Sequence, residues 1–247
     1  MKISIVTVVF NGASTLRSCI DSVLSQDYGL IEYIIVDGNS TDGTVEVVKS
    51  YGTKIHKFIS EPDKGIYDAM NKGIELATGD VIGILNADDF YSSDTVISGI
   101  VKAMATNDAE GAYGDLEYVD AVDNGIIKRN WKSGEYKAGA FLNGWMPPHP
   151  TFFLKKSLYQ RHGNFRLDMG SAADYELMLR MIHKIGIKLV YVPRVLVKMR
   201  AGGVSNSSIA NRISANQNDR KAWKINGLTP HFYTLWLKPL RKILQFM

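Results

Sequence analysis

The stretch Gly79-Asp80-Val81-Ile82-Gly83-Ile84-Leu85-Asn86-Ala87-Asp88-Asp89-Phe90 decides the fold of this chain of 247 residues. Its run of Val, Ile and Leu is typical of a strand that is buried on both faces, as in a parallel sheet. The run ends in two adjacent carboxylates, Asp88 and Asp89. Ligands of open α/β sheets bind outside the carboxyl ends of the strands, so the sequence places these two side chains at the edge of a cleft.

Asp88 and Asp89 indicate a metal site. Two neighbouring carboxylates repel each other unless a cation lies beside them, and their oxygens suit Mg²⁺ or Mn²⁺, which can hold a diphosphate. The alternative is a helix cap, because Asp and Ser are good N-caps and Ser92-Ser93-Asp94 opens the next helical pattern. Ser93 alone could cap that helix, which leaves the two carboxylates without a role. We therefore favour the metal interpretation.

Composition bounds the class of protein. Hydrophobic residues make up 45% of the chain, which is enough for one large domain or a domain with an appendage. A net charge of +4 suits anionic partners in general and does not single out nucleic acid, so we expect no nucleic-acid partner. Cys19 is the only cysteine, which fits a reducing compartment. With neither a signal peptide nor a membrane span predicted, we expect a cytoplasmic protein.

The first half of the chain alternates strand and helix patterns. Apolar residues at helical spacing predict helices over 16–24, around 45–48 and over 67–77. Such alternation predicts βαβ units and a mainly parallel sheet. The expected strands are 2–10, 31–36, 54–60 and 80–85.

Carboxylates recur where these strands end. Asp37 follows the second strand, Asp63 follows the third, and Asp88 and Asp89 follow the fourth. Each alone is an ordinary turn residue, but together they line one edge of the sheet. The G-x-G-x-x-G and P-loop phosphate motifs are absent, so a bound nucleotide would be held by carboxylates and a metal.

Four motifs in order resemble the family 2 glycosyltransferases, inverting enzymes with the GT-A fold. They are IVTVVFN at 5–11, VDGNSTDGT at 36–44, DKGIYDAMNKG at 63–73 and LNADD at 85–89. The resemblance covers residues 1 to about 200, and the motifs are specific because they occur together at this spacing.

The resemblance implies an α/β fold of GT-A type, with a Rossmann-like, mixed and mainly parallel sheet flanked by helices and a C-terminal helical appendage. The expected GT-A domain is 1–204, with a nucleotide-sugar-binding half at 1–110 and an acceptor half at 111–204. Residues 205–247 form the expected C-terminal helical extension.

The resemblance also implies donor contacts. Val8 and Phe10, at the end of the first strand, would contact the nucleotide base together with Asp37. Asp63 and Lys64 would lie near the base.

Asp88 resembles the metal-binding carboxylate of the family's D-x-D motif, and Asn86 replaces the first Asp of that motif. An amide oxygen can accept from ribose or from a metal-bound water but carries no charge, and Asp89 would compensate. Asn86 and Asp88 are therefore expected donor contacts. Asp88 and Asp89 are the expected ligands of Mn²⁺ or Mg²⁺.

The second half is less regular. Residues 111–119 and 126–131 predict two strands around the turn signal Asn124-Gly125. A stiff loop with three prolines follows and holds Trp145 and His149. The family places acceptor contacts in this region. We therefore expect the Trp145 ring to stack under an acceptor sugar and His149 to line the site. A structural role for His149 is the alternative.

Asp174 is the predicted general base. A sugar hydroxyl is a poor nucleophile, and a positioned carboxylate can take its proton. Apolar spacing predicts a helix that starts near Ala172 or Ala173. The family carries an acidic residue at the start of this helix, commonly as a Glu-Asp pair. Here that pair is Ala173-Asp174, with Ala in place of the Glu. We choose Asp174 over Glu176 because helix residues two apart face different directions. The alternative is that Asp174 only complements the helix dipole.

Residues 188–200 predict two short strands broken by Pro193-Arg194. The Gly-rich turn at 200–206 follows. The resemblance suggests that this loop closes over the donor, with Arg200 near the diphosphate. A surface connection with a solvated arginine is the alternative.

The C-terminal extension ends in an apolar, aromatic segment. Residues 207–226 are polar and compatible with a helix, whereas 232–246 hold many large apolar side chains beside Lys238, Arg241 and Lys242. This segment is too short and too charged to span a bilayer, but it suits the interface of an anionic membrane. We favour peripheral binding at the inner face of the cytoplasmic membrane. Docking on the protein's own core or in a homodimer is the alternative.

These patterns and the resemblance to bacterial O-antigen, exopolysaccharide and capsule enzymes predict an inverting hexosyltransferase. It would move a sugar from a UDP-sugar to a hydroxyl of a glycan or lipid-linked acceptor by metal-assisted single displacement. A non-catalytic nucleotide-sugar-binding or assembly module, suggested by Asn86, is one alternative. A sugar nucleotidyltransferase is another, but residues 11–14 lack the phosphate loop it needs.

Overall fold

The computed structural model describes residues 1–202 and 209–243. One mixed sheet forms its centre. The strands are β1 (Ile3–Val9), β2 (Ile31–Asp37), β3 (Lys57–Ser60), β4 (Val81–Asn86), β5 (Asp89–Tyr91), β6 (Gly111–Val119), β7 (Ile127–Trp131), β8 (Phe153–Lys155) and β9 (Leu189–Arg200). Their order is β3-β2-β1-β4-β8-β6-β9-β5, and β7 pairs with β6. Parallel pairs join β3, β2, β1 and β4, and also β6 and β9, which confirms the expected mainly parallel sheet.

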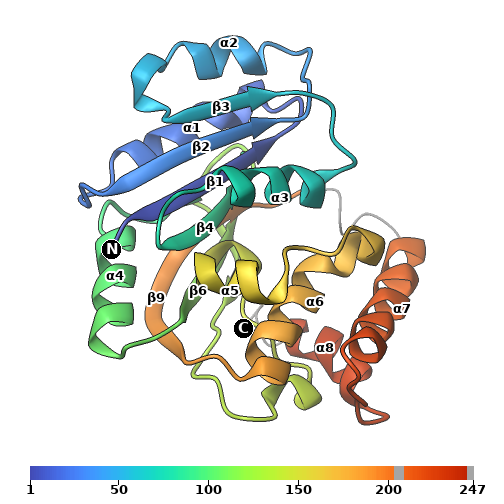
Figure 1. Cartoon of the computed structure of the whole chain (residues 1–247). Helices are drawn as coiled ribbons and strands as arrows, with labels where there is room; N and C mark the ends of the chain where they lie inside the picture. The colour runs from blue at the N-terminus through green and yellow to red at the C-terminus, as the bar shows by residue number, and fades with distance from the viewer. Residues whose placement is uncertain (203–208, 244–247) are drawn as a thin grey trace.

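Helices cover both faces of this sheet (Figure 1). They are α1 (Ala13–Leu24), α2 (Thr44–Lys49), α3 (Ile66–Leu76), α4 (Val96–Thr106), α5 (Lys156–His162), α6 (Ala173–Met178), α7 (Ile209–Ile225) and α8 (Thr234–Ile243). A π-helical segment, η5 (Leu179–Ile185), continues α6, and the short 3₁₀ segments are η1 (Gly52–Lys54), η2 (Ala140–Asn143), η3 (His149–Thr151) and η4 (Leu167–Ala172). One apolar core packs α1, α2 and α4 on the sheet, and a second packs α3, α5, α6 and α7 on it. Every residue of β1 is buried between them, which explains its unbroken run of Val, Ile and small polar residues.

The strand β9 differs from the two short strands that we expected. It runs without a break, because Pro193 and Arg194 bulge out of the ladder between β6 and β9. Gly114 pairs with Val192, and the next residue of β6 pairs with Val195. A bulge tolerates proline because the bulged residue makes no ladder hydrogen bond.

The C-terminal helices pack on the main domain. Trp223 of α7 is buried, and its Nε1 donates to Tyr175 Oη of α6 at 2.9 Å. Lys238 of α8 lies 3.6 Å from the centre of the Tyr175 ring and donates to Asp219 Oδ2 at 2.7 Å. The expected helical appendage is confirmed, and one face of α8 docks on the protein's own core. Within the described ranges, no helix has both the length and the apolarity that crossing a bilayer requires.

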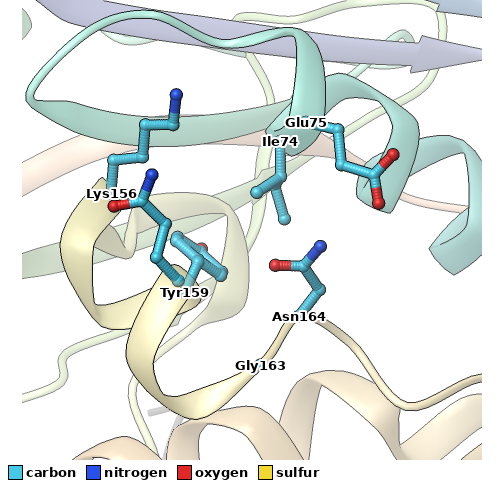
Figure 2. Close-up of a pocket in the computed structure, with 7 residues that line it drawn as sticks. Ile74, Glu75, Lys156, Tyr159, Gly163 and Asn164 are labelled. Carbon is cyan, nitrogen blue, oxygen red and sulfur yellow. The ribbon is translucent and has the colours of Figure 1, made fainter.

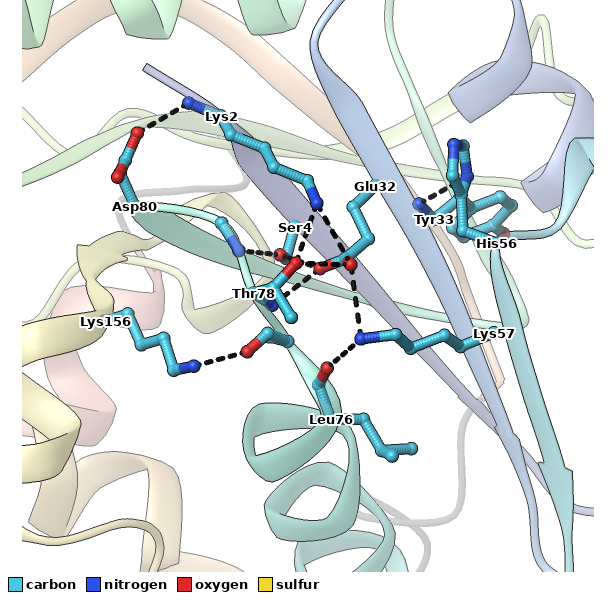
Figure 3. A network of polar contacts seen from close by, with 12 residues as sticks. Lys2, Ser4, Glu32, Tyr33, His56, Lys57, Leu76, Thr78, Asp80 and Lys156 are labelled. Atoms are coloured by element: carbon cyan, nitrogen blue, oxygen red, sulfur yellow. Dashed lines mark hydrogen bonds and ion pairs between the residues drawn. The ribbon is translucent and has the colours of Figure 1, made fainter.

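A buried polar network closes the amino-terminal edge of the sheet (Figure 3). Glu32 of β2 accepts hydrogen bonds from Ser4 Oγ at 2.6 Å and from the Thr78 backbone N–H at 2.7 Å, and it pairs with Lys2 and Lys57. Burial alone would raise the pKa of Glu32, but the hydrogen bonds from Ser4 and Thr78 outweigh it and hold that pKa well below its usual range. The network ties β1, β2, β3 and the approach to β4 at the edge opposite the strand ends that carry the predicted site.

Candidate active site

The carboxyl ends of β1, β2 and β4 meet at one edge of the sheet. Val8 of β1 pairs with Val36 on one side and with Asn86 on the other, and Val9 pairs with Asp37. The parallel registers therefore bring the ends of three predicted motifs together.

Asp37 is fully buried at this edge and shapes the loop after β2. Its Oδ1 accepts from Ser40 Oγ at 2.5 Å, and its Oδ2 accepts from the Ser40 N–H at 3.0 Å and from Ser60 Oγ at 2.6 Å. Each carboxylate oxygen therefore has a protein donor. The predicted contact between Asp37 and a base stays a prediction.

Phe10 and Asp63 lie next to Gly38 of that loop. The Phe10 ring is 67% exposed, whereas Val8 is buried. A Cβ at Gly38 would lie 2.5 Å from Asp63 Oδ2 and 3.4 Å from the Phe10 ring, so glycine permits the close approach of Asp63 to this loop. The exposed ring can stack on a base, and the neighbouring carboxylate can accept a hydrogen bond from an N–H of that base. Lys64 is exposed next to Asp63.

In the turn after β4, two buried side-chain oxygen atoms lack a hydrogen-bond donor among the described residues. Asn86 Nδ2 donates to Asp89 Oδ2 at 3.3 Å, while Asn86 Oδ1 and Asp89 Oδ1 are buried without a hydrogen-bond partner in the described part of the chain. Burial, and then the charge of Asp88, raises the pKa of Asp89 well above its usual range. Asp88 is only partly buried, so it is the more accessible of the two carboxylates.

These oxygens fit a divalent cation that has few protein ligands. Among the described residues, no group of three or more His, Cys, Asp and Glu side chains could hold a metal ion. Mg²⁺ is usually bound through one or two carboxylates, with water and substrate phosphates as its other ligands. The Asp88 carboxylate and the unpaired oxygens of Asn86 and Asp89 supply hard donors of this kind.

Arg200, the last residue of β9, links that strand to the Asp88 turn. Its Nη1 donates to the Asp88 carbonyl at 2.7 Å, its Nη2 donates to Ser18 Oγ at 2.8 Å, and its Cζ lies 4.8 Å from the centre of the Phe90 ring. The guanidinium therefore holds the backbone of the turn, and it is not the solvated side chain of our alternative.

Asp174 lies at the start of α6, partly buried, and its Oδ1 accepts from the Tyr175 N–H at 2.7 Å. Burial raises the pKa of Tyr67, and the charge of Asp174 raises it further. Asp174 also acts on His149, where it opposes the lowering of the pKa by burial. The structure thus brings Asp174 together with α3 and with the proline-rich loop.

Tyr118 lies near both the turn at Asp88 and Asp89 and the Asp174 carboxylate. Burial raises its pKa, Arg129 opposes this, and the charges of Asp89 and Asp174 both add to it. Met199 of β9 pairs with Tyr118 of β6 on one side and with Asp89 of β5 on the other. The Arg129 Cζ lies 3.7 Å from the centre of the Tyr118 ring.

Sequence reasoning missed Tyr67, Tyr118 and Arg129 as residues of this region. Tyr118 follows the ordinary alternation of a strand, and its closeness to Asp89 arises only once β6 and β5 both pair with β9. The motif at 63–73 was the one signal that could have pointed to Tyr67.

Glu176 points into the core, unlike the partly buried Asp174. It is fully buried, its oxygens accept from Arg180 Nε at 2.9 Å and Nη2 at 3.0 Å, and Asn226 Nδ2 donates to it at 3.1 Å. A carboxylate with these partners has a structural role, which supports the choice of Asp174.

Trp145 does not offer the sugar platform that we expected. Its ring is 6% exposed, and its Nε1 donates to the Ser133 carbonyl at 2.8 Å. Because the ring belongs to the core, no open face remains for stacking. The rings that pack around it are Tyr113, Tyr136 and Phe141.

His149 remains a candidate acceptor residue. Its ring packs edge-on against Phe165, with centroids 5.5 Å apart, and burial lowers its pKa, so the imidazole is neutral at neutral pH.

A separate pocket of about 420 Å³ lies between α3 and α5 (Figure 2). The Lys156 N–H donates to the Asp80 carbonyl at 2.9 Å, so the pocket adjoins the amino-terminal end of β4, away from Asp88. The Lys156 amine donates to the Ala77 carbonyl. None of the predicted site residues lines this pocket. Its lining residues are Ile74, Glu75, Lys156, Tyr159, Gln160, Gly163 and Asn164.

Comparison with known proteins places the chain in a family. The sequence profile described as Glycosyl transferase family 2 matches residues 4–164. The chain belongs to glycosyl transferase family 2. An uncharacterized glycosyltransferase of Mycobacterium tuberculosis is 34% identical to this family 2 chain over 181 residues, which are 72% of this chain and 68% of the relative. A PGL/p-HBAD biosynthesis glycosyltransferase of Mycobacterium bovis is 29% identical over 211 residues, 83% of this chain and 80% of that protein.

Solved structures share the fold. Staphylococcus aureus TarS in complex with UDP-GlcNAc matches with a TM-score of 0.72 and 14% identity, over 96% of this family 2 chain and 69% of the TarS chain. TarS in complex with UDP matches over 90% of this chain and 65% of that chain, with a TM-score of 0.69. The mannosyltransferase PcManGT of Pyrobaculum calidifontis, in complex with GDP-Man and Mn²⁺, has a TM-score of 0.66 at 19% identity, over 96% of this chain and 72% of that chain. The expected GT-A fold is confirmed.

Proposed function

We propose that this chain transfers a hexose from a nucleotide-diphosphate sugar, with UDP as the nucleotide, to a hydroxyl of a glycan or lipid-linked acceptor with inversion. One observation carries the proposal: the charges of Asp89, in the turn after β4, and of Asp174 both raise the pKa of Tyr118, so Tyr118 lies near both carboxylates. A turn suited to a diphosphate and a separate carboxylate therefore lie at one site. The UDP-GlcNAc complex of TarS and the GDP-Man complex of PcManGT support a nucleotide-sugar donor.

The donor would lie along the carboxyl ends of β1, β2 and β4. The exposed Phe10 ring would stack on the base, and Asp63, which lies beside it at Gly38, would accept a hydrogen bond from the base. The buried Asp37 holds the loop that borders this position.

The diphosphate would reach the turn after β4. Asp88, with the free oxygens of Asn86 and Asp89, would hold Mn²⁺ or Mg²⁺, which supplies positive charge to the leaving diphosphate. The Mn²⁺ complex of PcManGT supports this assignment. Arg200 keeps the Asp88 backbone in place.

Transfer would occur in one displacement. Asp174 accepts the proton of the acceptor hydroxyl as its oxygen bonds to the anomeric carbon. The bond from that carbon to the β-phosphate oxygen breaks, and its electron pair leaves with UDP. Attack from the face opposite the leaving group inverts the anomeric configuration.

The proposal is tested by a screen of UDP-glucose, UDP-galactose, UDP-GlcNAc and GDP-mannose with Mn²⁺, measured first by thermal shift. A bound donor at about 100 times its Kd stabilises the fold by about 2.7 kcal/mol, so one UDP-sugar should raise the Tm by a few degrees. The same donor should then release UDP slowly without acceptor. Binding without UDP release or transfer would instead support a non-catalytic module. Release of pyrophosphate from UTP supplied with a sugar 1-phosphate would instead support a nucleotidyltransferase.

We also infer that α8 binds the inner face of the cytoplasmic membrane. Phe232, Trp236 and Leu240 are 91%, 70% and 53% exposed, and their spacing of four puts them on one side of α8 and its approach. Residues 220–247 contain six Lys and Arg and no Asp or Glu, which suits anionic lipid headgroups. Lys238 and Arg241 already bond to Asp219 and to the Asn143 carbonyl, so the apolar side chains carry most of the attraction.

Replacing Phe232, Trp236 and Leu240 together by Ser should abolish sedimentation with vesicles of anionic phospholipid, because the bilayer contact loses its apolar area. UDP release in solution should be unchanged. The matched control is Val122→Ser, which removes a 94% exposed apolar side chain at the hairpin turn and should leave sedimentation intact. If the unmodified protein does not sediment with these vesicles at low salt, the membrane inference fails. A concentration-dependent dimer would then account for the exposed side chains.

A further inference from the structure

The helix α3 reaches across the molecule to the segment that carries Asp174. Tyr67 and Asn71 lie one turn apart, so they share a face of α3. Asn71 Nδ2 donates to the Phe165 carbonyl at 2.9 Å, and the Phe165 N–H donates back to Asn71 Oδ1 at 2.9 Å. This reciprocal pair fixes the chain shortly before η4 and α6.

Tyr67 contacts the segment that leads into Asp174. Its ring packs on Phe165 with centroids 5.4 Å apart, and its hydroxyl lies 3.5 Å from the Ser171 carbonyl, three residues before Asp174. The hydroxyl is also close enough to Asp174 for the charge of that carboxylate to act on it. Burial first, and then the charge of Asp174, raises the pKa of Tyr67 far above its usual range, so the phenol keeps its proton and can donate it.

We propose that Tyr67 is a positioning residue for Asp174: its hydroxyl donates to the carboxylate and holds it toward the acceptor. The proposal rests on the proposed role of Asp174 as general base. It also ties that base to the donor half, because α3 begins directly after Asp63-Lys64-Gly65. One helix therefore borders the donor position at its start and holds the base through Tyr67 of the same first turn.

Two other titratable groups face Asp174. They are His149 of η3 and Tyr118 of β6. Burial lowers the pKa of His149, and the charge of Asp174 opposes that lowering. Burial raises the pKa of Tyr118, so its hydroxyl stays protonated throughout the acid limb of the pH profile. Because Tyr67→Phe changes neither His149 nor Tyr118, we assign a shift of the acid limb in that variant to Asp174, the group that the Tyr67 hydroxyl is proposed to contact.

The test is Tyr67→Phe, which keeps the ring on Phe165 and removes only the hydroxyl. A hydrogen bond to a charged group contributes about 1.5–3 kcal/mol, so we expect kcat to fall roughly 10-fold or more while the KM for donor stays within about two-fold. A carboxylate that loses a donor holds its proton more tightly, so the acid limb of the pH–rate profile should move to higher pH. The pH at which the acid limb lies does not depend on the fraction of the enzyme that is folded. A shift of the limb is therefore distinct from a fall in rate that is caused by unfolding.

The matched control is Tyr159→Phe. Tyr159 of α5 is a buried tyrosine in the same core, on the wall of the separate pocket, and its variant should keep the pH profile of the unmodified protein. Asp174→Asn is measured in parallel. If Asp174→Asn loses turnover but Tyr67→Phe keeps both kcat and the acid limb, the positioning role is overturned and the base assignment survives. If Asp174→Asn keeps full turnover, the base assignment itself fails.

Discussion

Replacing Asp174 by Asn lowers the rate of sugar transfer about 10²–10⁴-fold, because loss of a general base typically has this cost. The substitution keeps the shape of the side chain, and the amide oxygen can still accept the 2.7 Å hydrogen bond from the Tyr175 N–H. Since Asp174 lies in the acceptor half and no donor contact is assigned to it, donor affinity should barely change. The measurement is kcat for transfer together with nucleotide binding by calorimetry.

The matched control for this substitution is Asp168→Asn, an exposed acid six residues earlier that pairs with Arg166 and Lys221. It should keep near-normal turnover. If Asp174→Asn is as active as the unmodified protein while Glu176→Gln loses turnover at unchanged stability, the wrong carboxylate has been assigned. A loss in Glu176→Gln that comes with a lower Tm would only reflect its buried contacts with Arg180 and Asn226.

Asp88→Ala should abolish transfer and remove the dependence of donor binding on Mn²⁺ or Mg²⁺. Asp88 is the accessible carboxylate of the turn, whereas Asp89 is fully buried and bonded to Asn86. Without Asp88 the turn keeps one buried carboxylate whose pKa is raised, and this is a poor anchor for a cation. Calorimetric titration of UDP with and without Mn²⁺ measures the effect independently of turnover.

The control for Asp88→Ala is Asp94→Ala, which removes an exposed carboxylate a few residues further along the chain. UDP affinity and its metal dependence should stay unchanged in that variant. Unchanged turnover of Asp88→Ala, or full activity of the unmodified protein in excess chelator, would contradict the metal assignment.

Most of the donor half could be predicted because its signals are local. The apolar runs of β1, β2 and β4 and the helical spacing in α1 and α3 are set by neighbours in sequence. The strand β5 was missed because three residues carry no periodicity, and its partner strand lies about 100 residues further along the chain. The bulge at Pro193 was predicted as a break, because sequence alone does not show that β6 continues beside it.

The candidate-site residues that belong to a sequence motif could be predicted. Those that come close to the site only through strand pairing were missed. Asp88 and Asp174 follow recognisable segments, whereas the closeness of Tyr118 to Asp89 depends on the shared partner Met199. Trp145 shows the opposite error. A tryptophan in a proline-rich loop has the same sequence pattern whether the ring faces a sugar or the core, and here the core encloses it.

The pairing of β5 with β9 has a consequence for the order in which the protein assembles. β5 follows directly after Asp88, but its ladder partners are Val197, Lys198 and Met199. During synthesis the ribosome therefore releases residues 1–110 long before the strand that fixes the turn at Asp88. Contacts between residues so distant in sequence form slowly. A nascent chain, or one cleaved before residue 189, retains the donor-side strands but lacks the pairing that shapes the turn.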